Sequence, residues 1–300
     1  MEASTAKVLS MVSLGLGSFI AGVIPACFSE NARKRHPLLL SCLLCFGGGV
    51  LLSTSIIHML PEAREKLKDA EFMFCIGFFI VYLVDEFVHL IYGSANPTSE
   101  HQNQTYGSSE ETRLLHDDEM RERNCEGSRL CHVGHVEPCN QSASGIIGLL
   151  CALFVHSVLE GLAIGLQETT TQVLLLLAAV SSHKFVVGFC LGAELCSTYP
   201  RRVCMHITCI IIFSAGSVVG IGAGAGLQTF RSLQDSTAVP IMQALAAGTL
   251  LYVTVSEVLP RERARWHERK RAAGLAQFVA VVVGFAVMYL TTKYLDHDAA

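Results

Sequence analysis

The chain has 300 residues, of which 51% are hydrophobic and 16% charged, and its mean hydropathy is +0.44. Soluble domains keep about a quarter of their residues charged, so this composition excludes an ordinary globular domain and indicates a membrane protein. The formal net charge of -4 offers no basic surface for nucleic acid.

Eight apolar stretches are long enough to cross a membrane, because a hydrocarbon core of about 30 Å needs about 20 apolar residues in a helix. We therefore predict an all-α polytopic membrane protein with eight transmembrane helices. A cleaved signal peptide is disfavoured for the first stretch, because the residues before it lack the expected positive charge. The predicted helices span residues 8–28, 38–60, 72–92, 145–167, 173–196, 203–227, 239–259 and 272–294.

These helices divide the chain into three parts. Residues 1–92 hold helices one to three, residues 93–144 form a polar loop, and residues 145–300 hold helices four to eight. Of the 22 Lys and Arg residues, fifteen fall in the connections on the side of the long loop and six on the other side. Cationic residues favour the cytosolic side, so we expect a cytosolic loop and extracellular termini.

The second stretch ends near His58 and Glu62, which are four residues apart. Residues at this spacing share a helix face, so the pair would form an entrance that collects a cation. The alternative is two solvated residues at a helix end. The third stretch carries Asp85, Glu86 and His89, for which we expect a solvated or interfacial face.

The loop at residues 93–144 has a composition typical of disorder. It contains Cys131, His132 and His135, whose spacing fits no structural zinc finger, so we expect only weak metal binding there. The twelve cysteines predict no disulfide framework, because nine lie in or beside apolar stretches and three lie in this loop.

The fourth and fifth stretches carry the residues that indicate chemistry. His156 and Glu160 are four apart within the fourth stretch, and His183 and Lys184 lie within the fifth. An ionisable group inside a bilayer is costly and by default functional. Two imidazoles and a carboxylate on neighbouring helices make three ligands of a tetrahedral zinc shell, and a fourth position left open would let the ion leave.

The seventh stretch carries Glu257 near its cytosolic end. This carboxylate would be an exit ligand for the ion. The alternative is an interfacial residue beside Arg261 and Arg263.

Three segments resemble the ZIP (zinc- and iron-regulated) family of metal transporters. The most specific is HSVLEGLAIGLQ at residues 156–167, which is similar to the fourth-helix signature of the family. FGGGV at residues 46–50, and residues 246–249 with 257–260, are similar to the family as well.

This resemblance implies a ZIP-type two-bundle arrangement and an elevator-type carrier that moves zinc toward the cytosol, with Cd²⁺, Fe²⁺ and Mn²⁺ as further candidate substrates. It also implies a plasma-membrane location and assigns the primary metal site to His156, Glu160 and His183. Ser157 and Ser217 stand where some binuclear relatives use Asn and Glu. Because Lys184 adds a cation beside His183, our hypothesis is a single metal site with a degenerate second one.

Two alternatives to transport remain open at this point: a multi-pass receptor that senses metal, and an intramembrane metalloprotease. A protease of that kind uses His-Glu-x-x-His on one helix, whereas here Ser157 follows His156, so we expect no enzyme. The expected partners are divalent metal ions, the lipid bilayer and a second copy of the chain in a homodimer, with no nucleic acid.

Overall fold

The computed structural model describes residues 2–27, 37–92, 143–199, 202–228, 237–266 and 271–299. All eight predicted spans are helices long and apolar enough to cross a membrane. Of the loop predicted at 93–144, all but the last two residues lie outside the described part, and so do Cys131, His132 and His135.

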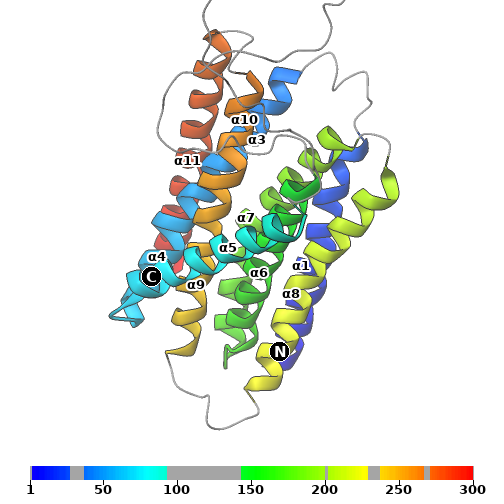
Figure 1. Cartoon of the computed structure of the whole chain (residues 1–300). Coiled ribbons are helices and arrows are strands. Elements are labelled where there is room, and N and C mark those ends of the chain that lie inside the picture. The colour runs from blue at the N-terminus through cyan, green and yellow to red at the C-terminus, as the bar shows by residue number, and fades with distance from the viewer. Residues whose placement is uncertain are drawn as a thin grey trace, which may run out of the picture.

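The first four membrane helices are built from six elements (Figure 1). The second helix is continuous through three of these, because α3, η1 and α4 follow one another without a break. The elements are α1 (Ala3–Cys27), α3 (Pro37–Ser53), η1 (Thr54–Met59), α4 (Leu60–Lys66), α5 (Ala70–Tyr92) and α6 (Ala143–Gly165).

The last four membrane helices follow the same plan, with the seventh again divided into three consecutive elements. These are α7 (Thr170–Thr198), α8 (Val203–Leu227), α9 (Ala238–Tyr252), η3 (Val253–Val258), α10 (Leu259–Trp266) and α11 (Arg271–Ala299). In the part of the chain that is described, every regular element is helical.

Helices two and seven each contain one π-helical segment, η1 and η3, and a proline follows each segment after one intervening leucine. In each, the residue before the proline donates its N–H to a carbonyl five residues back, Leu60 to Ser55 and Leu259 to Thr254. A proline ring clashes with the carbonyl four residues before it and has no N–H. The wider turn relieves that clash, and such turns are frequent at functional sites.

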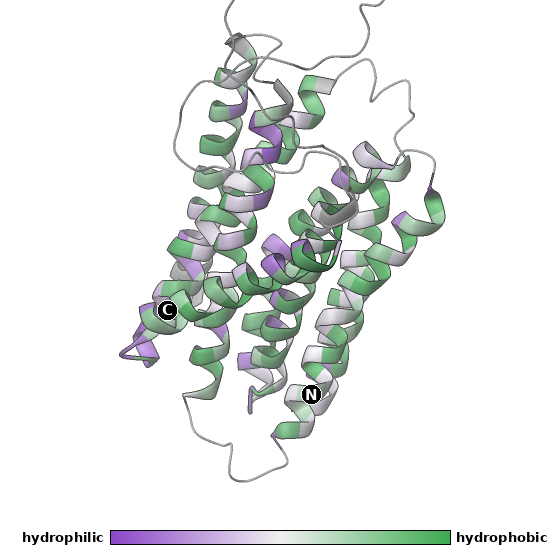
Figure 2. Ribbon diagram, viewed as in Figure 1, coloured by the Kyte–Doolittle hydropathy of each residue, from purple (hydrophilic) through white to green (hydrophobic). Residues whose placement is uncertain are grey.

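The helices pack in partner pairs. α1 lies along α7 and α8, and α6 lies along α8, whereas α3 pairs with α11 and α5 with α9. α6 also contacts α9 and α5. Apolar residues dominate the long helices (Figure 2), and α5 and α11 leave most of their surface uncovered by protein. Apolar side chains on such faces suit contact with lipid tails.

Two glycines let α6 and α8 approach closely. A Cβ on Gly161 would lie 2.6 Å from the Ser217 carbonyl oxygen, and one on Gly220 would lie 2.4 Å from that of Val158. Both contacts are shorter than real carbon–oxygen contacts, so only glycine fits. Small residues at helix contacts are characteristic of membrane bundles. Here they fix the rotation of α6, and with it the direction in which His156 and Glu160 point.

Candidate metal site

His156, Glu160 and His183 converge between α6 and α7, although 23 residues separate Glu160 from His183. One ligand atom from each lies within 4.8 Å of the others, and all three side chains are buried. His183 Nε2 is 2.7 Å from Glu160 Oε1, and His156 Nε2 is 3.8 Å from the same oxygen. Two zinc bonds of about 2.0–2.1 Å at a tetrahedral angle hold donor atoms roughly 3.3 Å apart. The two distances to Glu160 Oε1, 2.7 and 3.8 Å, lie on either side of this donor–donor distance.

The His156 ring is oriented from α9. Its Nδ1 lies 3.0 Å from the Ala246 carbonyl oxygen and 3.1 Å from Thr249 Oγ1. A carbonyl only accepts, so Nδ1 carries the proton and donates it, and the lone pair is on Nε2, which faces Glu160. Metal-binding histidines are commonly held in this way by an outer partner. The Thr249 hydroxyl in turn donates to the Ala246 carbonyl at 2.6 Å.

Lys184 points into the same buried space. Its Nζ lies 2.9 Å from Glu160 Oε2 and 3.0 Å from Ser157 Oγ, with the Phe213 ring 5.4 Å away. The ammonium and the carboxylate therefore neutralise each other inside the membrane. Glu160 uses one oxygen toward the histidines and the other toward the lysine.

Two further polar atoms at the site have no hydrogen-bond partner among the described residues. These are Ser217 Oγ and His183 Nδ1, and both are buried. Ser217 lies on α8 beside the close contact with α6. An unpaired buried hydroxyl is costly, and its position next to the metal-site helices is consistent with a vestigial ligand position.

A small cavity joins the metal site to the end of helix two. His58 and Glu62 line one part of it, and Glu160 and His183 line another. The structure therefore brings the predicted entrance pair, His58 and Glu62, to the same cavity as two of the three predicted metal ligands. The side-chain amide of Gln243 on α9 donates to Glu62 at 2.8 Å.

Glu257 lies apart from this group, in η3. Its carboxylate accepts a hydrogen bond from Arg261 one turn later, and the pair is largely buried. In this arrangement the guanidinium covers an oxygen that an ion would need. The position of Glu257 is consistent with both interpretations, an exit ligand for the ion and an interfacial residue paired with Arg261.

Sequence reasoning missed two sets of polar contacts. The first is the pair formed by Thr249 and the Ala246 carbonyl, which no local spacing connects to His156. The second is the contact of Asp85, which we expected on a solvated or interfacial face. Asp85 Oδ2 accepts the Tyr252 hydroxyl at 2.9 Å, and the side chain is only 13% exposed. Asp85 thus ties α5 to α9.

Comparison with known proteins gives one consistent result. A family model described as ZIP zinc transporter matches residues 4–292. Zinc transporter ZIP3 of Mus musculus is 30% identical, over 94% of this chain and 96% of its own length. Zinc transporter ZIP1 of Homo sapiens is 29% identical, over 94% and 89% respectively, and zinc transporter ZIP2 of Homo sapiens is 28% identical, over 93% and 94%.

Proposed function

Because this chain belongs to the ZIP zinc transporter family, it is a membrane transporter of divalent metal and not an enzyme, and we propose that its zinc ion binds between α6 and α7. In this proposal His156, Glu160 and His183 are the ligands, and water completes the shell. The observation that carries the proposal is the burial of all three side chains with their ligand atoms within 4.8 Å of one another. Imidazole ligands favour zinc and similar metals, such as Cd²⁺ and Fe²⁺, over calcium and magnesium. Mn²⁺ is a candidate substrate from the resemblance to the family alone.

The experiment is uptake of radiolabelled zinc into proteoliposomes. We expect saturable uptake that is lost in His156→Ala and in Glu160→Ala, because either change removes a ligand. Glu168→Gln is a matched control, since this exposed carboxylate follows α6 but lies outside the site. Uptake by His156→Ala at the level of the control would overturn the site assignment. Zinc binding by the wild type without uptake would instead support a sensor.

The entrance that we propose is the cavity beside His58 and Glu62. Its support is geometric, because the cavity reaches from these residues to Glu160 and His183. A carboxylate and an imidazole at its mouth would concentrate cations near the site. Glu62 also keeps a neutral partner, Gln243, which leaves its negative charge uncompensated by that contact.

The single-ion hypothesis is part of the same proposal. Lys184 Nζ lies between Glu160 and Ser157, where the ammonium supplies a positive charge and would repel a second ion. Ser217 Oγ has no hydrogen-bond partner in the described part of the chain, and the Ser217 backbone carbonyl lies against Gly161 of α6, so we assign the other side of the degenerate position to this residue. We therefore expect one zinc per chain, and two per chain would contradict the hypothesis.

We further propose that α1, α6, α7 and α8 move together past α3, α5, α9 and α11, carrying the ion toward the cytosol. The support is that α1, α7 and α8 pack on one another and α6 packs on α8, whereas α3 pairs with α11 and α5 with α9. The excess of Lys and Arg in the connections on one side favours extracellular termini and a cytosolic long loop. The plasma membrane is the location that we propose from the resemblance to the family.

A further inference from the structure

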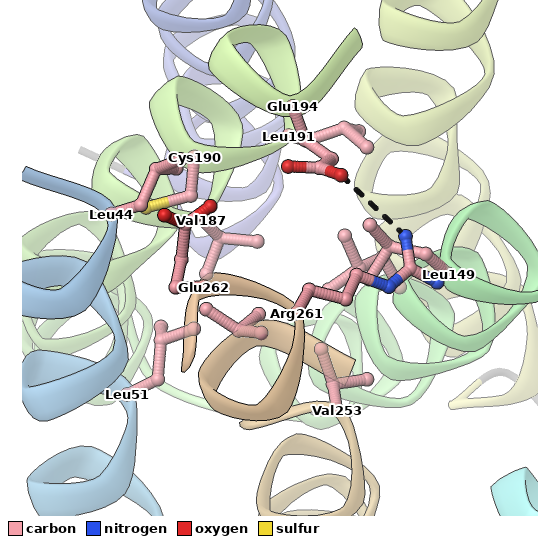
Figure 3. Close-up of a pocket in the computed structure, with 12 residues that line it drawn as sticks. Leu44, Leu51, Leu149, Val187, Cys190, Leu191, Glu194, Val253, Arg261 and Glu262 are labelled. Atoms are coloured by element: carbon pink, nitrogen blue, oxygen red, sulfur yellow. Dashed lines mark ion pairs between the residues drawn. The ribbon is translucent and has the colours of Figure 1, made fainter. Parts of the chain in front are cut away.

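A second cavity lies beyond the metal site toward α10 (Figure 3). Leu153 of α6 and Leu191 of α7 belong to one wall, and Leu51 of α3 and Val253 of η3 belong to the other. The lining is therefore largely apolar and is shared between the helices that carry the site and those that do not. Charge enters it through Glu194, Arg261 and Glu262.

Arg261 connects the two walls. Its Nη2 donates to the Gly145 carbonyl oxygen at 2.7 Å and to Glu257, and its Nη1 lies 3.8 Å from Glu194 Oε1. Figure 3 shows the guanidinium pointing across the cavity toward Glu194. Gly145 begins the membrane part of α6 and Glu194 lies near the end of α7. One side chain thus contacts both helices that carry the metal ligands.

Helix α10, which carries Arg261, is fixed to α3 and α11. Ser41 of α3 donates to Glu262 at 2.5 Å, and the Gln277 amide of α11 donates to Ser41 and to the Glu262 carbonyl at 2.9 Å each. These buried contacts hold α10 against α3 and α11. The bonds from Arg261 to Gly145 and Glu194 therefore join two groups of helices.

We propose that Arg261 is a positioning residue for transport, a latch that holds this end of the ion path closed while the metal site faces the opposite end. This inference rests on the proposed movement of α6 and α7. A guanidinium does not lose its proton in proteins, so Arg261 stays paired with Glu257 and Glu194 and covers carboxylate oxygens that an ion leaving the site would need. When α6 and α7 move away, Arg261 keeps Glu257, which lies one turn away, and leaves Gly145 and Glu194.

Cys190 provides the readout, because its buried thiol lines the cavity. Membrane sheets with both faces exposed are treated with a water-soluble methanethiosulfonate reagent, and modification of Cys190 is followed by peptide mass spectrometry. In Arg261→Gln we expect Cys190 to react about tenfold faster, because hydrogen bonds from a charged donor across the cavity are lost. In Glu194→Gln we expect a smaller increase, since the bond to Gly145 remains.

Arg263→Gln is the matched control, because Arg263 lies on the same helix with an exposed side chain. Its labelling rate should equal that of the wild type. The latch is refuted if Arg261→Gln, or Glu194→Gln should the first variant not reach the membrane, labels at the wild-type rate. It is equally refuted if Arg263→Gln labels as fast as Arg261→Gln. The labelling needs no metal, so a failed latch is distinguishable from failed zinc uptake.

Discussion

The charged groups of the candidate metal site are stabilised by partners that lie on a neighbouring helix. Lys184 and Glu160 approach to 2.9 Å, and Glu160 also meets His183 at 2.7 Å. Breaking a buried pair leaves an uncompensated charge, which costs about 3–5 kcal/mol. Glu160, His183 and Lys184 therefore stabilise one another, and these contacts hold the proposed ligands in place before an ion arrives.

Thr249 offers a test of how His156 is oriented. Thr249→Val removes the hydroxyl that contacts His156 Nδ1 but leaves the Ala246 carbonyl in place. We expect the KM for zinc uptake to rise about tenfold, the low end of the effect of losing an outer partner of a metal ligand. The control is Thr254→Val, because Thr254 is also buried and donates only to its own helix, at Leu250. Equal KM values for the two variants would contradict this role.

At the scale of single residues, the sequence indicates the ligands that we propose but not the contacts that orient His156. His156, Glu160 and His183 stand out because ionisable groups inside apolar stretches are rare. The outer partners of His156 are a backbone carbonyl and a threonine about ninety residues away. Such contacts depend on tertiary packing, so neither spacing nor residue type indicates them.

Helices are held in register by backbone contacts that depend on individual glycines. Gly220 and Gly226 lie on the same helix, α8, but a Cβ on Gly220 would lie 2.4 Å from the Val158 carbonyl oxygen, whereas one on Gly226 meets nothing within 4 Å. The first position therefore sets the spacing between α6 and α8. At Gly226 there is space for a side chain.

This difference predicts opposite effects of the same substitution. Gly220→Ala should lower the free energy of unfolding by about 1–3 kcal/mol through overpacking. Gly226→Ala should raise it by up to about 1 kcal/mol, because alanine favours the helix more than glycine does. Thermal unfolding of the purified protein measures both. A lower Tm for Gly226→Ala than for Gly220→Ala would show that the close contact does not exist.

At the scale of elements, hydropathy predicts all eight spans because the width of the bilayer fixes their length. It places the ends of helices two and seven too early, since the helices continue as α4 and α10 after the apolar residues stop. The π-helical segments were not predicted. Pro61 and Pro260 are the signal that could have located them, because a single residue separates each proline from the end of such a segment.

The molecule as a whole presents two cavities on opposite sides of the metal ligands. One includes Glu160 and His183 together with His58 and Glu62, and the other lies toward α10 and is crossed by Arg261. This arrangement fits the carrier that we propose, in which the metal site would face one side of the membrane at a time. The pairing of helices that creates it could not be derived from periodicity, and the expectation of two bundles came from the family resemblance alone.

Acid should inhibit transport. An imidazole binds metal only in its neutral form, and its ordinary pKa is about 6.5. Protons compete with zinc for imidazole ligands, so we expect zinc uptake to decline as the medium is acidified. Initial rates measured at constant free zinc test this. Uptake that rises steadily with acid would contradict the prediction and indicate coupling to protons.

The binding of zinc by His156, Glu160 and His183 is tested most directly by an anomalous difference map recorded at the zinc edge from crystals of the zinc-loaded protein. The account predicts one peak between α6 and α7, about 2.0–2.2 Å from a nitrogen of each histidine and an oxygen of Glu160. Zinc density that lies elsewhere, with no peak among these three side chains, would contradict it.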